Sequence, residues 1–170
     1  MRLVTRLIAV WAITTFVSST IPYAHGQPKP VRLITHGIDD RELVVLRGNT
    51  HPMARPQFDR GAAPNTLPME RMLLVLKRSP EQEAALEKFM DEQLDRTSVN
   101  YHRWLTPEEF GQQFGPAEQD IEAVSSWLKS CGFLVTNVSK SRRVMEFSGT
   151  AGEILATFHA AIHKYVVDGD

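Results

Sequence analysis

The sequence predicts an α+β domain of the ferredoxin-like, split βαβ type, in which helices cover one face of a four-stranded antiparallel sheet. Two observations lead to this fold class. Short apolar runs alternate with segments of helical periodicity, in the order strand, helices, strand, strand, helix, strand. Right-handed crossovers then place all helices, including extra helices inserted in the first crossover, on one face of the sheet.

The first half of this pattern begins with a continuous apolar run at residues 72–76, which is typical of a central strand. Ser79 and Pro80 follow it and mark the start of a helix, because Ser caps helix N-termini and Pro fits the first helical position. A capping box at residues 106–109 predicts a second, short helix that stops near Gly115.

The second half contains one long helix, a hairpin, a short helix and a final strand. Gly132 has the position of a left-handed cap residue and ends the long helix. The predicted ranges are a helix over 117–130, hairpin strands over 133–138 and 143–147, a helix starting at 150–153, and a last strand over 162–167.

The N-terminal region predicts export. Residues 1–26 run from Arg2 and Arg6 through an apolar stretch to small residues, which is the order of a secretory signal peptide. The apolar stretch is too short to cross a bilayer, so we expect a secreted or periplasmic protein with no membrane attachment after cleavage. Residues 27–66 are rich in Pro and Gly and predict an extended lead-in with one edge strand at 42–46. A flexible linker is the alternative for residues 50–67.

Charge and motifs limit the possible functions. The formal net charge of −1 provides no positive field for nucleic acid. The sequence lacks the common catalytic and metal-binding motifs, namely a nucleophile elbow, a phosphate-binding loop, a zinc-type cysteine pair and a His-Glu-x-x-His motif. We therefore expect no catalytic, cofactor or metal residues in this chain. His159 and His163 are four residues apart, but the boundary between the last helix and strand separates them, and structural roles are favoured over a metal site.

The first predicted strand suggests a binding surface. Its side chains alternate, with Leu73 and Val75 on one face and Met72, Leu74 and Leu76 on the other. If helices cover one face only, one of these sets lacks a cover, and such apolar patches usually mark partner surfaces. We take Met72, Leu74 and Leu76 as the candidate partner-facing set. The alternative is that the lead-in folds back over that face.

Several blocks resemble a known family. Residues 72–77, 100–110, 114–116, 124–128, 132–133 and 147–149 are similar to the prokumamolisin activation domain, the propeptide of the sedolisin or serine-carboxyl endopeptidases. The block Asn100-Tyr-His-Arg-Trp-Leu-Thr-Pro-Glu-Glu-Phe110 is the most specific part, and residues 34–68 resemble the lead-in of bacterial members.

The resemblance implies a secreted zymogen whose propeptide assists folding of the peptidase domain, masks its active site and is removed in acid. Residues 67–170 would be the activation domain, truncated before a linker and a catalytic domain that carries the catalytic residues and a calcium site. The implied partner is the cognate peptidase domain, in cis or in trans. His159 and His163 are then candidate pH sensors, since histidines held neutral at a contact become charged in acid and weaken it. A stand-alone secreted inhibitor, or an unrelated ferredoxin-like binding or oligomerisation module, remains open.

Overall fold

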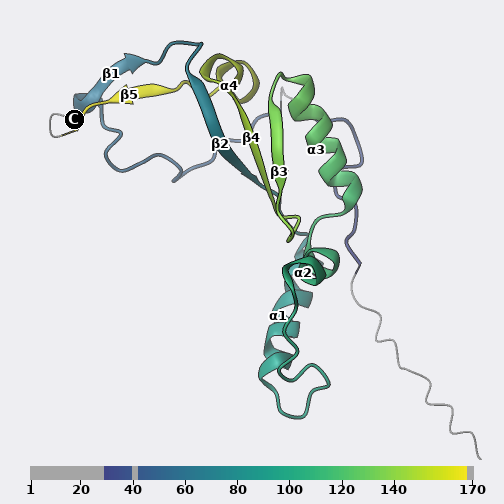
Figure 1. Cartoon of the computed structure of the whole chain (residues 1–170). Coiled ribbons are helices and arrows are strands. Elements are labelled where there is room, and N and C mark those ends of the chain that lie inside the picture. Colours follow the sequence, from purple (N-terminus) through teal and green to yellow (C-terminus); the bar gives the residue numbers. More distant parts are fainter. Residues whose placement is uncertain (1–28, 40–41, 168–170) are drawn as a thin grey trace, which may run out of the picture.

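The computed structural model describes residues 29–39 and 42–167, and the predicted signal peptide lies outside these ranges. Within them the chain forms a mixed α+β fold with two small antiparallel sheets and four α-helices (Figure 1). None of the helices in the described part of the chain is long and apolar enough to cross a membrane. In chain order the elements are η1 (Pro56–Phe58), β1 (Asp59–Ala62), β2 (Pro68–Val75), α1 (Pro80–Leu94), α2 (Pro107–Phe114), α3 (Glu118–Ser130), β3 (Leu134–Val138), β4 (Val144–Thr150), α4 (Ala151–Phe158) and β5 (His163–Tyr165).

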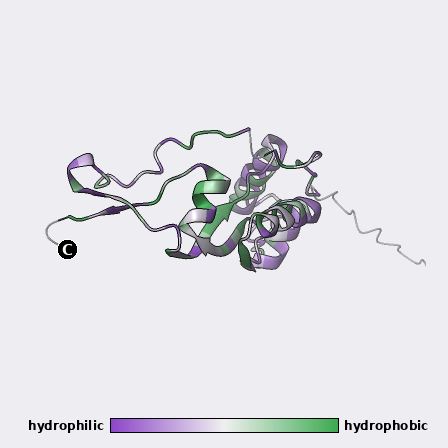
Figure 2. Ribbon diagram, turned by 90° about the horizontal axis from the view of Figure 1, so that it is seen from above, coloured by the Kyte–Doolittle hydropathy of each residue, from purple (hydrophilic) through white to green (hydrophobic). Residues whose placement is uncertain are grey.

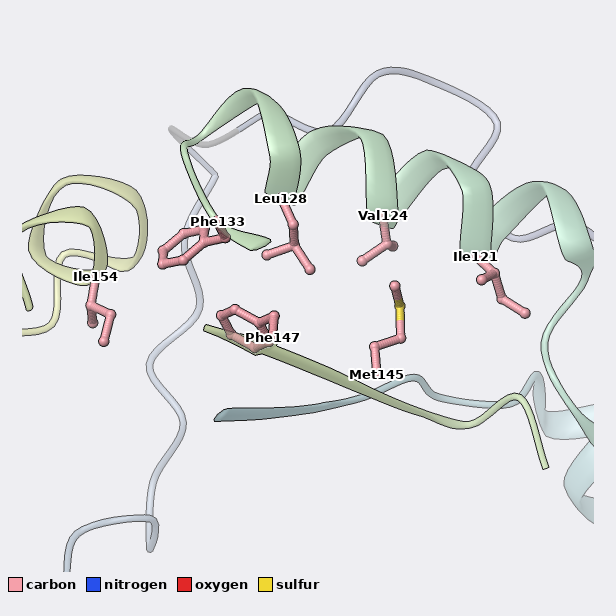
Figure 3. Close-up of a cluster of buried hydrophobic side chains, with 7 residues drawn as sticks. All are labelled: Ile121, Val124, Leu128, Phe133, Met145, Phe147 and Ile154. Carbon is pink, nitrogen blue, oxygen red and sulfur yellow. The ribbon is translucent and has the colours of Figure 1, made fainter. Parts of the chain in front are cut away.

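The larger sheet has three strands in the order β2-β4-β3, and all neighbours are antiparallel. One face of this sheet packs against α3 and α4. Three apolar side chains of α3 point at the Met145 and Phe147 side chains of β4, which are almost completely buried (Figure 3). Most of α4 is apolar (Figure 2), so it closes the same face of the sheet. The central cluster consists of Ile121, Val124, Leu128, Phe133, Met145, Phe147 and Ile154.

The predicted fourth strand does not join this sheet. Instead, β5 pairs with β1 in a separate two-stranded sheet, with Asp59 opposite Tyr165. The lead-in is responsible, because the backbone N–H groups of Ala151 and Gly152 donate to carbonyls of residues 67 and 65, both at 2.9 Å. These bonds fix the start of α4 beside the lead-in, and the chain that leaves α4 meets β1. The mixed α+β class is confirmed, whereas the four-stranded sheet was wrong.

The prediction that all helices cover one face of the sheet was also wrong. Only α3 and α4 do so, while α1 and α2 pack on each other and project beyond the end of the sheet (Figure 1). Their contact is aromatic, with the rings of Phe89 and Phe114 5.4 Å apart between centroids. Local signals for the starts of these helices are confirmed, because Ser79 and Thr106 each form a complete capping box. The helices fit their own small core rather than the sheet.

The N-terminal described segment is attached to α3. The carboxylate of Asp120 is buried and accepts the backbone N–H groups of Leu33 (2.9 Å) and Ile34 (2.8 Å). The Ile34 side chain packs against the central cluster. We call residues 29–39 the strap, since they run along the helix without regular secondary structure. The predicted edge strand at 42–46 was wrong, because those residues are exposed and form no strand.

Candidate functional site

The face of the β2-β4-β3 sheet that lies opposite α3 and α4 exposes several large apolar side chains. On β2 the exposed fractions are 63% for Leu73 and 55% for Val75, and Leu134 on β3 is 65% exposed. We call this surface the open face. An apolar sheet face without a cover is a surface that can bind an apolar region of a partner with little rearrangement.

The predicted partner-facing set lies on the other side of the strand. Met72 and Leu74 stand opposite Phe147 and Met145 in the β2–β4 register, and directly opposed residues project to the same face. Met72, Leu74 and Leu76 therefore pack against the central cluster, and the choice of these three as the uncovered set was wrong. Alternation in the sequence separates the two sets but does not say which set the helices cover.

Polar groups cross the middle of the open face. Glu146 on the central strand lies 3.7 Å from the Nε atom of Arg71, and the hydroxyl of Thr136 donates to the Glu146 carbonyl at 3.1 Å. Arg71 has a φ of 55° where the β2 register shifts between Met69 and Met72. The bulge therefore turns this arginine onto the open face, where it supplies a charged contact beside the apolar ones.

The candidate pH sensor His163 lies on the smaller sheet. Its Nδ1 atom is 2.9 Å from Oδ2 of Asp59, so the side chains join β5 to β1. A bond from the backbone N–H of Gly61, followed by the bond with His163, holds the pKa of Asp59 below its ordinary value.

The second candidate, His159, ends α4. It adopts a left-handed conformation with a φ of 52°, which is the backbone geometry of a helix cap. His159 thus directly follows α4 and His163 lies on β5, so neither belongs to the three strands of the open face. Among the residues that the structure describes, no three His, Cys, Asp or Glu side chains are grouped as metal ligands would be.

The most specific sequence block builds the connection between α1 and α2. The side-chain amide of Asn100 donates to Glu92 at 2.6 Å, and the backbone N–H of His102 donates to the Gln93 carbonyl at 3.1 Å. The side chain of Gln93 in turn donates to the carbonyl of Arg103. These bonds fix the reversal of the chain, so the block has a structural role. Trp104, in the same block, stays exposed.

Comparison with known proteins identifies the family of the chain. Residues 58–170 match the family model described as "Pro-kumamolisin, activation domain". The chain is similar to xanthomonalisin of Xanthomonas sp. (strain T-22), with 31% identity over 118 residues, which is 67% of this chain and 14% of that protein. It is also similar to sedolisin of Pseudomonas sp. (strain 101), with 26% identity over 96 residues, 56% of this chain and 16% of that protein. The chain thus corresponds to a small part of the length of these relatives. Because the family model covers β1 to β5 with all four helices, the chain belongs to the pro-kumamolisin activation domain family.

Proposed function

We propose that this chain is the propeptide of a secreted serine-carboxyl peptidase precursor, and that it binds the peptidase domain through the open face of the β2-β4-β3 sheet. The bound propeptide would assist folding of the peptidase domain, block its substrate cleft and be removed in acid. The parent's serine-type activity is part of this proposal. The observation that carries it is the exposed apolar row on β2 and β3 in a member of an activation-domain family.

Burial of the open face supports the docking mode. Leu73, Val75 and Leu134 each keep more than half of their surface accessible in the free chain. Full burial of a fully exposed side chain of this size contributes about 1.5–3 kcal/mol, and somewhat more than half of that remains available at each of these positions. Three such side chains supply a substantial part of a specific interface. The Arg71–Glu146 pair adds a polar element that orients the partner.

A single interface explains both chaperone and inhibitor activity. A surface that binds only the folded peptidase domain stabilises that domain by mass action. The same contact prevents substrates from reaching a cleft that lies beneath the bound propeptide. A stand-alone inhibitor would use the same surface in trans, and the presence of a peptidase domain in the same reading frame separates the two cases.

The test measures binding to the peptidase domain of the same precursor, with its nucleophilic serine replaced. Leu73→Asp and Leu134→Asp place a charge on the open face, so we expect each to weaken binding by at least about tenfold in a calorimetric titration. Both side chains are largely exposed in the free chain, and each substitution should change its free energy of unfolding by less than about 1 kcal/mol. Leu155→Asp is the matched control, because exposed Leu155 lies on α4, on the covered side of the sheet.

Two results would contradict the proposal. Equal binding by the parent chain and Leu73→Asp would remove the open face from the interface. A reading frame without any peptidase domain would reject the propeptide function, even if the chain inhibits a separate enzyme.

A further inference from the structure

The two helices that project from the sheet form a rigid unit with a distinct charge. We call residues 80–114, comprising α1, α2 and their connection, the helical arm. Arg78 at its base donates from Nε to the Phe114 carbonyl at 2.7 Å, and Lys140 of the β3–β4 turn lies 2.7 Å from Glu108. A Cβ atom at Gly111 would overlap the carbonyl oxygen of Lys140, so the turn and α2 are in close contact. The helical arm is therefore held in a fixed orientation.

The helical arm also exposes large apolar side chains. Trp104 is 70% exposed and Leu94 is 75% exposed, and Met90 and Val99 are also exposed. Met90 and Trp104 border a groove of about 450 Å³ between α1, the connection and α2. The rest of the lining is mostly apolar, and its charged residues are Arg78, Glu83 and Arg143. This surface lies on helices, separate from the open face.

Charge indicates what kind of partner fits the groove. The helical arm carries eight acidic and three basic side chains, a formal charge of −5. Glu83 and Glu87 follow each other at helical spacing along the edge of α1 that also bears Met90 and Leu94. The exposed indole of Trp104, on an arm of this charge, is suited to the side chain of lysine or arginine, which can stack on the ring.

The two arginines of the lining offset only part of this charge. The side chain of Arg78 is 3% exposed and is paired with Glu83 at 3.2 Å, so this pair is neutral as a whole. Arg143 keeps its charge, because its hydrogen-bond partner is the uncharged Leu76 carbonyl, and with both arginines counted the surface has a formal charge of −3. Two copies of the helical arm would bring like charges together, which disfavours a symmetric contact between arms. Anionic membranes are disfavoured for the same reason.

We propose that the helical arm is a second interaction surface, which binds a basic, amphipathic segment of a partner protein with an apolar side chain in the groove and its cations against the acidic edge and Trp104. This inference is independent of the docking proposed for the open face. The two surfaces lie on different elements, so substitutions can separate them.

The test uses a random dodecapeptide library displayed on phage. The library is selected on the purified chain and counter-selected on the Trp104→Ala variant. We expect enrichment of peptides that combine lysine or arginine with leucine or aromatic residues. A synthetic enriched peptide should bind Trp104→Ala at least about tenfold more weakly than the parent, with Trp104→Phe intermediate, and should lose affinity as salt is raised. Leu155→Ala is the control and should bind like the parent.

Several results would contradict the proposed binding of a basic segment. Enrichment of acidic or uncharged peptides, an affinity unaffected by Trp104→Ala, or no peptide that survives counter-selection would overturn the proposal. Self-association through the helical arm in sedimentation experiments, abolished by Met90→Asp, would identify a second copy as the occupant. Binding to phosphatidylserine vesicles that Met90→Asp removes would identify a membrane instead. Circular dichroism shows whether Trp104→Ala folds. If Trp104→Ala does not fold, Met90→Asp takes its place in the affinity comparison.

Discussion

Removal of the Asp120 carboxylate should release the strap from α3. Asp120→Ala deletes the acceptor of two backbone N–H groups, those of Leu33 and Ile34. Hydrogen bonds to a charged group contribute about 1.5–3 kcal/mol each. Packing of the partly buried Ile34 side chain adds about 1 kcal/mol.

Part of this free energy is recovered when the strap leaves. The released N–H groups bind water, and each freed residue regains about 1–2 kcal/mol of conformational entropy. We therefore expect a net loss of about 2 kcal/mol in the free energy of unfolding. Asp120→Asn should cost nearly as much, because its amide keeps one acceptor and turns an N–H group toward the second backbone donor.

Urea unfolding followed by circular dichroism measures the loss, and amide hydrogen exchange at Leu33 and Ile34 shows whether the strap has been released. Glu122→Ala is the control, since Glu122 is exposed on the same helix. Unchanged exchange at both amides, together with a stability loss below about 0.5 kcal/mol, would refute the argument that Asp120 holds the strap.

Two further predictions concern the core and the smaller sheet. Leu128 has no exposed surface, so Leu128→Ala should lower the free energy of unfolding by about 2–5 kcal/mol in urea titrations, whereas Leu134→Ala on the open face should cost less than about 1 kcal/mol. The pKa of Asp59 is lowered in the folded chain, so its stabilising contribution is present above its unfolded pKa and is lost as pH falls through the folded pKa. Thermal unfolding of the parent and Asp59→Asn should therefore differ at pH 6, and the difference should shrink as pH falls below about 3.9, the ordinary pKa of an aspartate. A difference that grows in acid would contradict this sign.

Local signals in the sequence predicted local structure well. Ser79 and Thr106 start helices where expected, because a capping box depends on residues only three positions apart. Gly132 adopts the positive φ expected of a residue that ends a helix. Confirmation of the family resemblance also rests on sequence blocks of this local kind.

Long-range pairing could not be derived in the same way. The last strand had two possible partners, the free edge of β2 and the lead-in, and the choice depends on bonds between α4 and residues 65–67. His163 meets Asp59, which is 104 residues away, so no local pattern reveals the pair. The open face was assigned to the wrong side of β2. Alternation of side chains along a strand shows which residues share a face, but it does not show which of the two faces the helices cover.

The strap and β1 share a property that affects the order of folding. Their partners are synthesised much later, since Leu33 bonds to a residue 87 positions further on and Asp59 to one 104 positions further on. Contacts of such sequence separation form slowly, because a long loop must close before they contribute any stability. The helical arm and the β3–β4 hairpin, by contrast, close over short distances. We therefore expect the strap and β1 to join the structure after these local elements, the strap once α3 has been made and β1 once β5 has been made.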